Sequence, residues 1–151
     1  MSEMFDCPND LILRQRAIVV SIYLEYLLDV LSCASGMSVT KALVLMFLSK
    51  SIEAHGTRLL NGRYSKQLLE RATCAVSGDF DLFLYELEYS IEAIEIAANA
   101  GLVAIEDAMV SLTSNGRSQD NKMNNLFLTH LIDEVVSLDD GYVLLEMIRN
   151  V

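Results

Sequence analysis

The chain has 151 residues, a formal net charge of −10 and a hydrophobic fraction of 52%. This length suits one domain with a packed core, and the negative charge opposes long-range attraction to DNA phosphates and anionic lipids. The sequence has no run of about 18 apolar residues, which excludes a membrane-spanning helix. Because the first residues, MSEMFD, also lack the basic segment of a signal peptide, we expect a cytoplasmic protein.

The residues that most often bind metals are scattered. Three cysteines, Cys7, Cys33 and Cys74, and two histidines, His55 and His130, are widely separated in the sequence. A zinc site needs about four closely spaced ligands. We therefore expect reduced, mostly buried thiols and no metal or other cofactor. The sequence also lacks a phosphate-binding loop and a nucleophile motif, so we expect a protein that is not an enzyme.

The first predicted element is a helix over residues 10–35, which Asn9 or Asp10 caps and Gly36 ends. Its polar side chains form one narrow stripe along an otherwise apolar helix: Arg14, Ser21, Glu25, Asp29 and Ser32. A helix of this kind is mostly buried, either in its own core or against another subunit. The pattern predicts a protein that works in an assembly and that can form a homo-oligomer when isolated.

The second predicted helix, residues 41–54, begins after Ser38 or Thr40, ends at Gly56, and lets Lys50 extend to solvent. A short helix over residues 65–76 follows. Around its start lies the only dense basic run of the chain, within residues 57–71: Arg58, Arg63, Lys66 and Arg71. These side chains either contact nucleic acid or pair with the excess carboxylates of the protein.

The next helix is predicted over residues 80–99, after a cap at Asp79 or Asp81 and before Gly101. Apolar side chains spaced by three and four residues predict its core stripe: Leu84, Leu87, Ile91, Ile94 and Ala98. Three carboxylates share the opposite face, and two tyrosines lie on or beside it: Glu88, Glu92 and Glu95, with Tyr85 and Tyr89.

Two β-favouring runs, LVAI and AMVSLT, predict a hairpin over residues 102–113 with its turn at Glu106–Asp107. The segment SNGRSQDN is predicted to be a loop. Helices then occupy residues 120–151 and are interrupted at Asp139–Gly141. The predicted fold class is therefore mainly α with a small β-hairpin, an α+β protein in which residues 1–151 form a single domain.

The order of three helices, a hairpin and the ending LTSNGR resembles a winged helix over residues 38–116. The resemblance covers about half of the chain and implies a winged-helix-like core. The helices at 10–35 and 120–151 lie outside that core. Flanking helices in this superfamily often form dimers or dock on partners.

The overall layout resembles a second, more specific family. The chain opens with FDCPNDLILRQRAIVVSIYLEYLLDVL, continues with the apolar helix KALVLMFLSKSIEAHG and has a wing-like element. It is similar to the small middle subunit of three-component ABC-ATPase systems, the Lamassu type of bacterial defence. The resemblance implies an adaptor that binds an SMC-like ATPase, which works with an effector that is often a nuclease.

A winged helix that reads DNA places its third helix in the major groove and its wing on the backbone. Here the segment from Ala72 to Gly116 has no lysine, arginine or histidine. It carries eight carboxylates: Asp79, Asp81, Glu86, Glu88, Glu92, Glu95, Glu106 and Asp107. Phosphate contacts need cations, so we expect no direct readout of DNA by this helix.

The acidic helix face has two interpretations. A run of charges is usually a solvated surface. Alternatively, the three glutamates with Tyr85 and Tyr89 bind a basic surface of a protein partner, since aromatic side chains favour interfaces and no cation lies nearby in the sequence. The alternative function is a winged-helix transcriptional regulator that binds DNA through residues 57–71.

Overall fold

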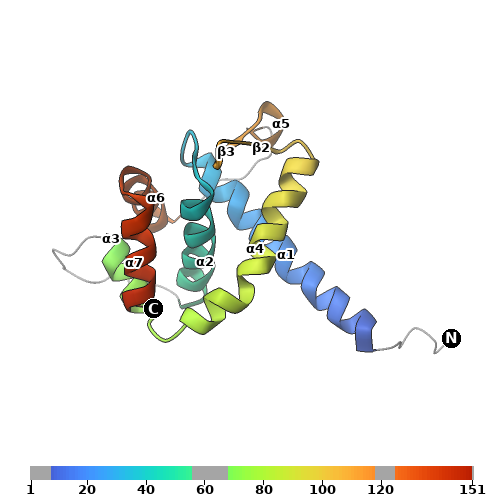
Figure 1. The fold of residues 1–151 in the computed structure, drawn as a ribbon, viewed down its shortest axis with the longest axis horizontal. Helices are drawn as coiled ribbons and strands as arrows, with labels where there is room; N and C mark the ends of the chain where they lie inside the picture. Colours follow the sequence, from blue (N-terminus) through green and yellow to red (C-terminus); the bar gives the residue numbers. More distant parts are fainter. Residues whose placement is uncertain (1–7, 56–67, 118–124, 151) are drawn as a thin grey trace.

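The computed structural model describes residues 8–55, 68–117 and 125–150 (Figure 1). These residues are mainly helical with a small antiparallel sheet, which confirms the α+β prediction. In chain order the elements are α1 (Pro8–Ser32), β1 (Met37–Ser38), α2 (Val39–His55), α3 (Leu68–Ala75), α4 (Phe80–Asn99), β2 (Val103–Glu106), β3 (Met109–Leu112), α5 (Ser114–Arg117), α6 (Leu126–Ser137) and α7 (Asp140–Asn150).

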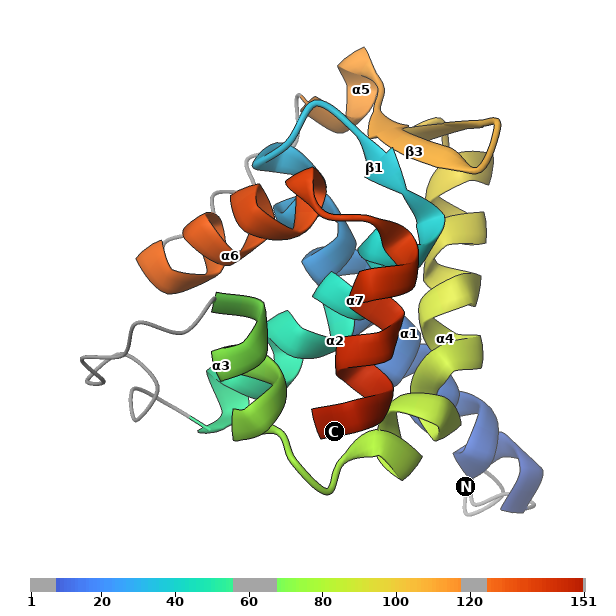
Figure 2. The ribbon, with the colours of Figure 1, turned by 60° about the vertical axis from the view of Figure 1, so that its left-hand side comes forward.

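Helix α2 lies at the centre of the fold, with α1, α3, α4, α6 and α7 packed around it (Figure 2). Every side chain from Val44 to Ser49 is buried. A helix that is apolar around its whole circumference belongs in the interior, where other helices remove all its faces from water. Of the two residues predicted to begin α2, Ser38 is the cap, because its hydroxyl oxygen accepts a hydrogen bond from the Lys41 amide at 3.1 Å.

The predicted hairpin is present and forms part of a three-stranded sheet with the strand order β1-β3-β2. The turn was predicted one residue too early. It consists of Asp107 and Ala108, whose φ angles of 52° and 61° are typical of a two-residue turn that matches the twist of the strands. Strand β1, which was not predicted, is antiparallel to β3, and its Met37 is paired with Val110 of β3.

The segment after the hairpin, predicted to be a loop, begins with the single helical turn α5. The Thr113 hydroxyl donates to the Gly101 carbonyl at 2.5 Å and accepts from the Gly116 amide at 3.1 Å. A Cβ atom at Gly116 would lie 2.1 Å from the carbonyl oxygen of Leu102, so only glycine fits there. The two hydrogen bonds of Thr113 and the close packing of Gly116 on Leu102 hold α5 against the start of the hairpin.

Helix α1 is buried along only part of its length. Its C-terminal half contributes Leu27 and Leu31 to the core, so the predicted burial applies to this half. Its N-terminal half extends to the edge of the molecule (Figure 1) and is largely exposed, so it is not buried in the chain's own core. Four large aliphatic side chains there are 57–62% exposed: Leu11, Ile12, Leu13 and Ile18.

Helices α6 and α7 form the predicted C-terminal pair. The connection between them contacts β1 and the start of α2. The break between them lies at Leu138–Asp139, close to the predicted position. The Lys41 ammonium donates to the Val136 carbonyl at 3.0 Å, and the Ser38 hydroxyl donates to the Asp140 carboxylate at 2.8 Å. These two contacts fix the connection between α6 and α7 against the start of α2.

Two further predictions concern exposure. The thiols are less buried than predicted, because Cys33 is half-buried and Cys74 is exposed, while Cys7 lies outside the described residues.

None of the helices within the described ranges has the length and apolar content needed to cross a bilayer.

Candidate functional site

The buried face of helix α4 overlaps only in part with the one predicted. Among the predicted core residues Ile94 is buried and Leu87 and Ala98 pack against the core, but Leu84 is 50% exposed and Ile91 is 40% exposed. The buried face contains polar as well as apolar residues: Phe83, Glu86, Ser90, Ala93, Ile94 and Ala97. The periodicity of the large apolar residues placed the centre of the buried face incorrectly, because a glutamate and a serine occupy two of the interior positions.

The buried carboxylate of Glu86 is held by two partners from earlier helices. The Lys50 ammonium lies 2.7 Å from Glu86 Oε2, and the Tyr23 hydroxyl donates to Glu86 Oε1 at 3.1 Å. Burial and the neighbouring carboxylate raise the pKa of the Tyr23 hydroxyl well above its usual value. Lys50 therefore binds an interior anion while 29% of its side-chain surface stays exposed, and Glu86 is not one of the surface acids.

The outer side of α4 carries an acidic ridge, formed by Asp81, Glu88, Glu92 and Glu95. The expectation that these acids lack a neighbouring cation was wrong, because Arg16 of α1 pairs with two of them. Its guanidinium nitrogens lie 2.8 Å from Glu92 Oε2 and 3.3 Å from Glu88 Oε1. The hydrogen bond to Glu92 is the main cause of a raised pKa for Arg16.

The two predicted tyrosines lie beside the same ion pairs. The rings of Tyr85 and Tyr89 meet edge to face with centroids 6.0 Å apart, and the Arg16 guanidinium carbon lies 5.2 Å from the Tyr89 ring centroid. Tyr85 is 69% exposed. The fold therefore brings four predicted site residues together around Arg16, while Glu95 is exposed one turn further along α4.

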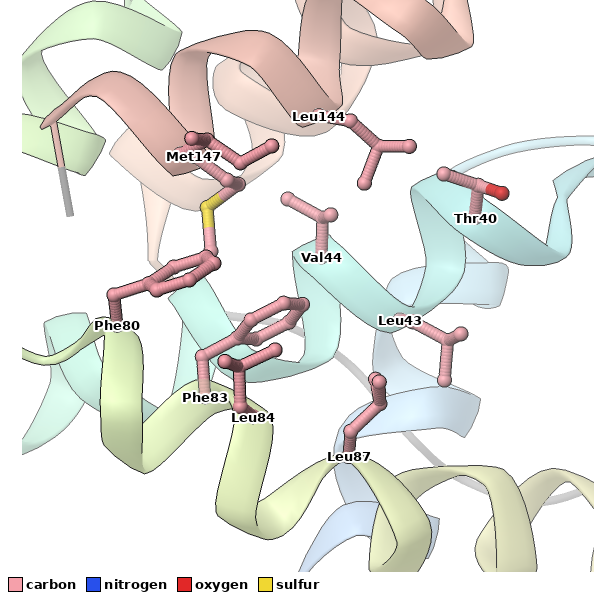
Figure 3. A pocket seen from close by; sticks show the side chains of 10 residues that line it. Thr40, Leu43, Val44, Phe80, Phe83, Leu84, Leu87, Leu144 and Met147 are labelled. Carbon is pink, nitrogen blue, oxygen red and sulfur yellow. The ribbon is translucent and has the colours of Figure 1, made fainter.

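An apolar groove runs along the other flank of α4, where this helix faces α2 and α7 (Figure 3). Its volume is about 260 Å³. Side chains from the three helices line this apolar groove: Thr40, Leu43 and Val44 of α2, Phe80, Phe83, Leu84 and Leu87 of α4, and Leu144, Met147 and Ile148 of α7. Sequence reasoning missed the groove because its lining residues come from helices far apart in the chain.

The apolar groove and the acidic ridge share one helix. Leu84 and Leu87 line the groove, while Asp81 and Glu88 lie within one turn of them on the ridge. Ile148 on the opposite wall is 63% exposed, so the groove is open to solvent. This arrangement suits an amphipathic helix that places apolar side chains in the groove and basic side chains against the ridge.

The basic run proposed as a nucleic-acid contact is described in part. Arg58, Arg63 and Lys66 lie outside the described residues. Arg71 belongs to α3 and is half-buried, with its guanidinium carbon 5.4 Å from the ring centroid of Phe127 in α6. This contact directs Arg71 toward the neighbouring helix.

Within residues 8–55, 68–117 and 125–150, no three histidine, cysteine or acidic side chains lie close enough together to hold a metal ion. Comparisons with protein-family models, with curated proteins and with solved structures found no match to this chain. The geometry of the site is therefore the basis for a functional assignment.

Proposed function

We propose that this protein is a non-catalytic adaptor subunit that binds a protein partner through the apolar groove and the acidic ridge. The observation that carries the proposal is the open groove, whose walls expose Leu84, Leu144 and Ile148 beside a line of carboxylates. Removing one half-exposed leucine from water contributes about 1 kcal/mol to the free energy of binding. A partner helix that fills the groove makes several such contacts, which together stabilise the complex.

The resemblance to the small subunit of Lamassu-type systems names the partner. We propose an SMC-like ABC ATPase of a bacterial defence system, with an effector that carries out the chemistry. The succession of α4 and the β2-β3 hairpin supports the related proposal of a winged-helix-like core. In this proposal α4 contacts protein and not DNA, because its outer side presents carboxylates.

This proposal expects an SMC-like ATPase to be encoded beside the gene, and the test measures binding between that ATPase and the purified chain. Leu84→Asp places a charge in the groove and is expected to weaken binding by at least about tenfold. Leu126→Asp is the matched control, because Leu126 is 70% exposed at the start of α6, away from the groove. Equal binding of the ATPase by Leu84→Asp and the parent protein would contradict the proposal.

A second variant tests the acidic ridge. Reversing Glu88 and Glu92 is unsuitable, because both pair with Arg16 and their loss would also disturb α1. The double variant Asp81→Lys/Glu95→Lys changes exposed ridge positions instead. We expect slower association with the ATPase at low salt, since rim charges act mainly on the on-rate. The control is Glu106→Lys/Asp133→Lys, which makes the same charge change elsewhere.

The transcription-regulator alternative predicts a different result with duplex DNA. Binding by the chain alone, with an affinity that falls as salt rises and that is lost when the basic residues of 57–71 are replaced, would support that alternative. The adaptor proposal expects no such binding.

A further inference from the structure

The outer face of α1 points away from the core and carries a shallow hollow of about 280 Å³. The hollow is lined by Ala17, Ile18, Ser21, Ile22 and Glu25. Ile18 is 60% exposed, and it stands next to two small side chains that leave room on the helix surface. On a helix-packing surface, a large aliphatic side chain such as Ile18 is a knob, and the space above small side chains is the hole that receives a knob from the other helix.

Opposite charges lie at the two ends of this face. Arg14 is exposed one turn before Ile18, and Glu25 is exposed one turn after Ser21. The other arginine of this helix, Arg16, points to α4 and is held by its glutamates. The outer face is thus positive at its N-terminal end, apolar in the middle and negative at its C-terminal end.

We infer that a second copy of this chain docks on the outer face, with the two α1 helices antiparallel about a two-fold axis. In this pairing Ile18 of each copy lies near Ser21 of the other, and Ala17 leaves space for the second Ile22. The same alignment places Arg14 of one copy opposite Glu25 of the other, because this pair of positions has the same midpoint on the helix as the two apolar pairs. Each contact occurs twice, since the two-fold axis relates the two copies.

Glu25 lies next to a second carboxylate of the same helix, Asp29. Burial, followed by the charges of Glu53 on α2 and of Glu25, raises the pKa of Asp29, so acidic groups gather at this end of the outer face. An incoming Arg14 offsets this repulsion. The outer face shares no residue with the apolar groove or the acidic ridge, so the inference does not depend on the proposed function.

The contact is small. Residues 11–25 of a helix span about 22 Å, and one pair of helices of this length is at the low end of specific interfaces. We therefore expect a reversible dimer with a dissociation constant on the order of tens of micromolar.

Sedimentation equilibrium of the full chain over a range of concentrations tests the inference. Arg14→Glu and Glu25→Arg each place like charges together and are expected to weaken the dimer by at least about tenfold. The double variant Arg14→Glu/Glu25→Arg restores both pairs and the dimer. A mixture of the two single variants is expected to form a heterodimer, because each supplies the charges that the other lacks.

Arg117→Glu and Glu106→Arg are the matched controls, since they make the same charge changes at exposed positions near the hairpin. Both are expected to dimerise like the parent, and circular dichroism checks that every variant is folded. A parent that stays monomeric up to high concentration would overturn the inference. Single reversals without effect, or a double variant that fails to recover, would overturn it as well.

Discussion

Two glutamates two residues apart on α4 bind cations in opposite environments. The Glu86 side chain is 7% exposed and binds the half-buried Lys50, whereas the Glu88 side chain is 63% exposed and binds Arg16 at the surface. Both pairs join α4 to an earlier helix. The difference between them teaches that the presence of an ion pair does not measure what it contributes to stability.

The contribution of an ion pair to stability depends on whether water can solvate the charge that remains when its partner is removed. At the surface, water solvates a charge whose partner has been removed, so an exposed ion pair contributes little. In the interior little water is available, and a charge left alone keeps most of its cost of desolvation. The Glu86 site is therefore expected to be sensitive to any single change, and the Glu88 site to tolerate it.

The largest expected effect is that of Glu86→Ala. The substitution leaves the half-buried Lys50 ammonium and the buried Tyr23 hydroxyl without their acceptor, and it is expected to lower the free energy of unfolding by about 2–3 kcal/mol. Urea denaturation measures the change. Glu88→Ala is the control on the same helix and is expected to unfold close to the parent. Similar losses in both variants would contradict the comparison.

A smaller effect is expected when the whole interior site becomes apolar. In the triple variant Tyr23→Phe/Lys50→Met/Glu86→Leu no buried polar group is left alone. Its free energy of unfolding should lie within about 2 kcal/mol of the parent, because buried ion pairs exchanged for apolar residues are often neutral. The same urea experiment checks this, and a triple variant as unstable as Glu86→Ala would be evidence against the explanation.

The third prediction concerns alkaline pH. The raised pKa of Tyr23 keeps its hydroxyl protonated in the folded state, whereas the unfolded residue ionises near pH 10. This contribution to stability is complete below pH 10 and is lost as the pH rises above it. Tyr23→Phe should cost about 1 kcal/mol at neutral pH, and the difference from the parent should shrink above pH 10. A difference that stays constant would contradict the prediction.

The smallest effect is expected for Arg16→Gln at the surface site. The thermal midpoint should fall slightly at low salt and match the parent at high salt, since mobile ions screen exposed pairs. Calorimetry at two salt concentrations checks this. A large, salt-independent loss would show that the packing of Arg16 on Tyr89 outweighs its charge.

Local signals predicted the extent of α4 but not the roles of its side chains. The helix ends where Gly101 adopts a φ of 75° and the Leu102 amide donates to the Ala97 carbonyl, a termination that short-range sequence encodes. The partner of Glu86 is Lys50, 36 residues earlier, and no local pattern connects the two.

The candidate site shows the same division. Tyr85, Glu88 and Glu92 were predicted as one face because helical periodicity brings them together. Arg16 was missed because it comes from another helix 72 residues before Glu88. The apolar groove was missed for the same reason, since it exists only after α2, α4 and α7 have packed together. Strand β1 has two residues, too few to show an alternating pattern.

The central position of α2 has a consequence for the synthesis of the protein. This helix leaves the ribosome before several of the helices that cover it, because α4, α6 and α7 are synthesised later. Until α7 emerges, side chains such as Leu45 and Leu48 have no complete interior to enter. The nascent chain thus carries a strongly apolar helix that chaperones can bind, and the fold closes only after α7 has been synthesised.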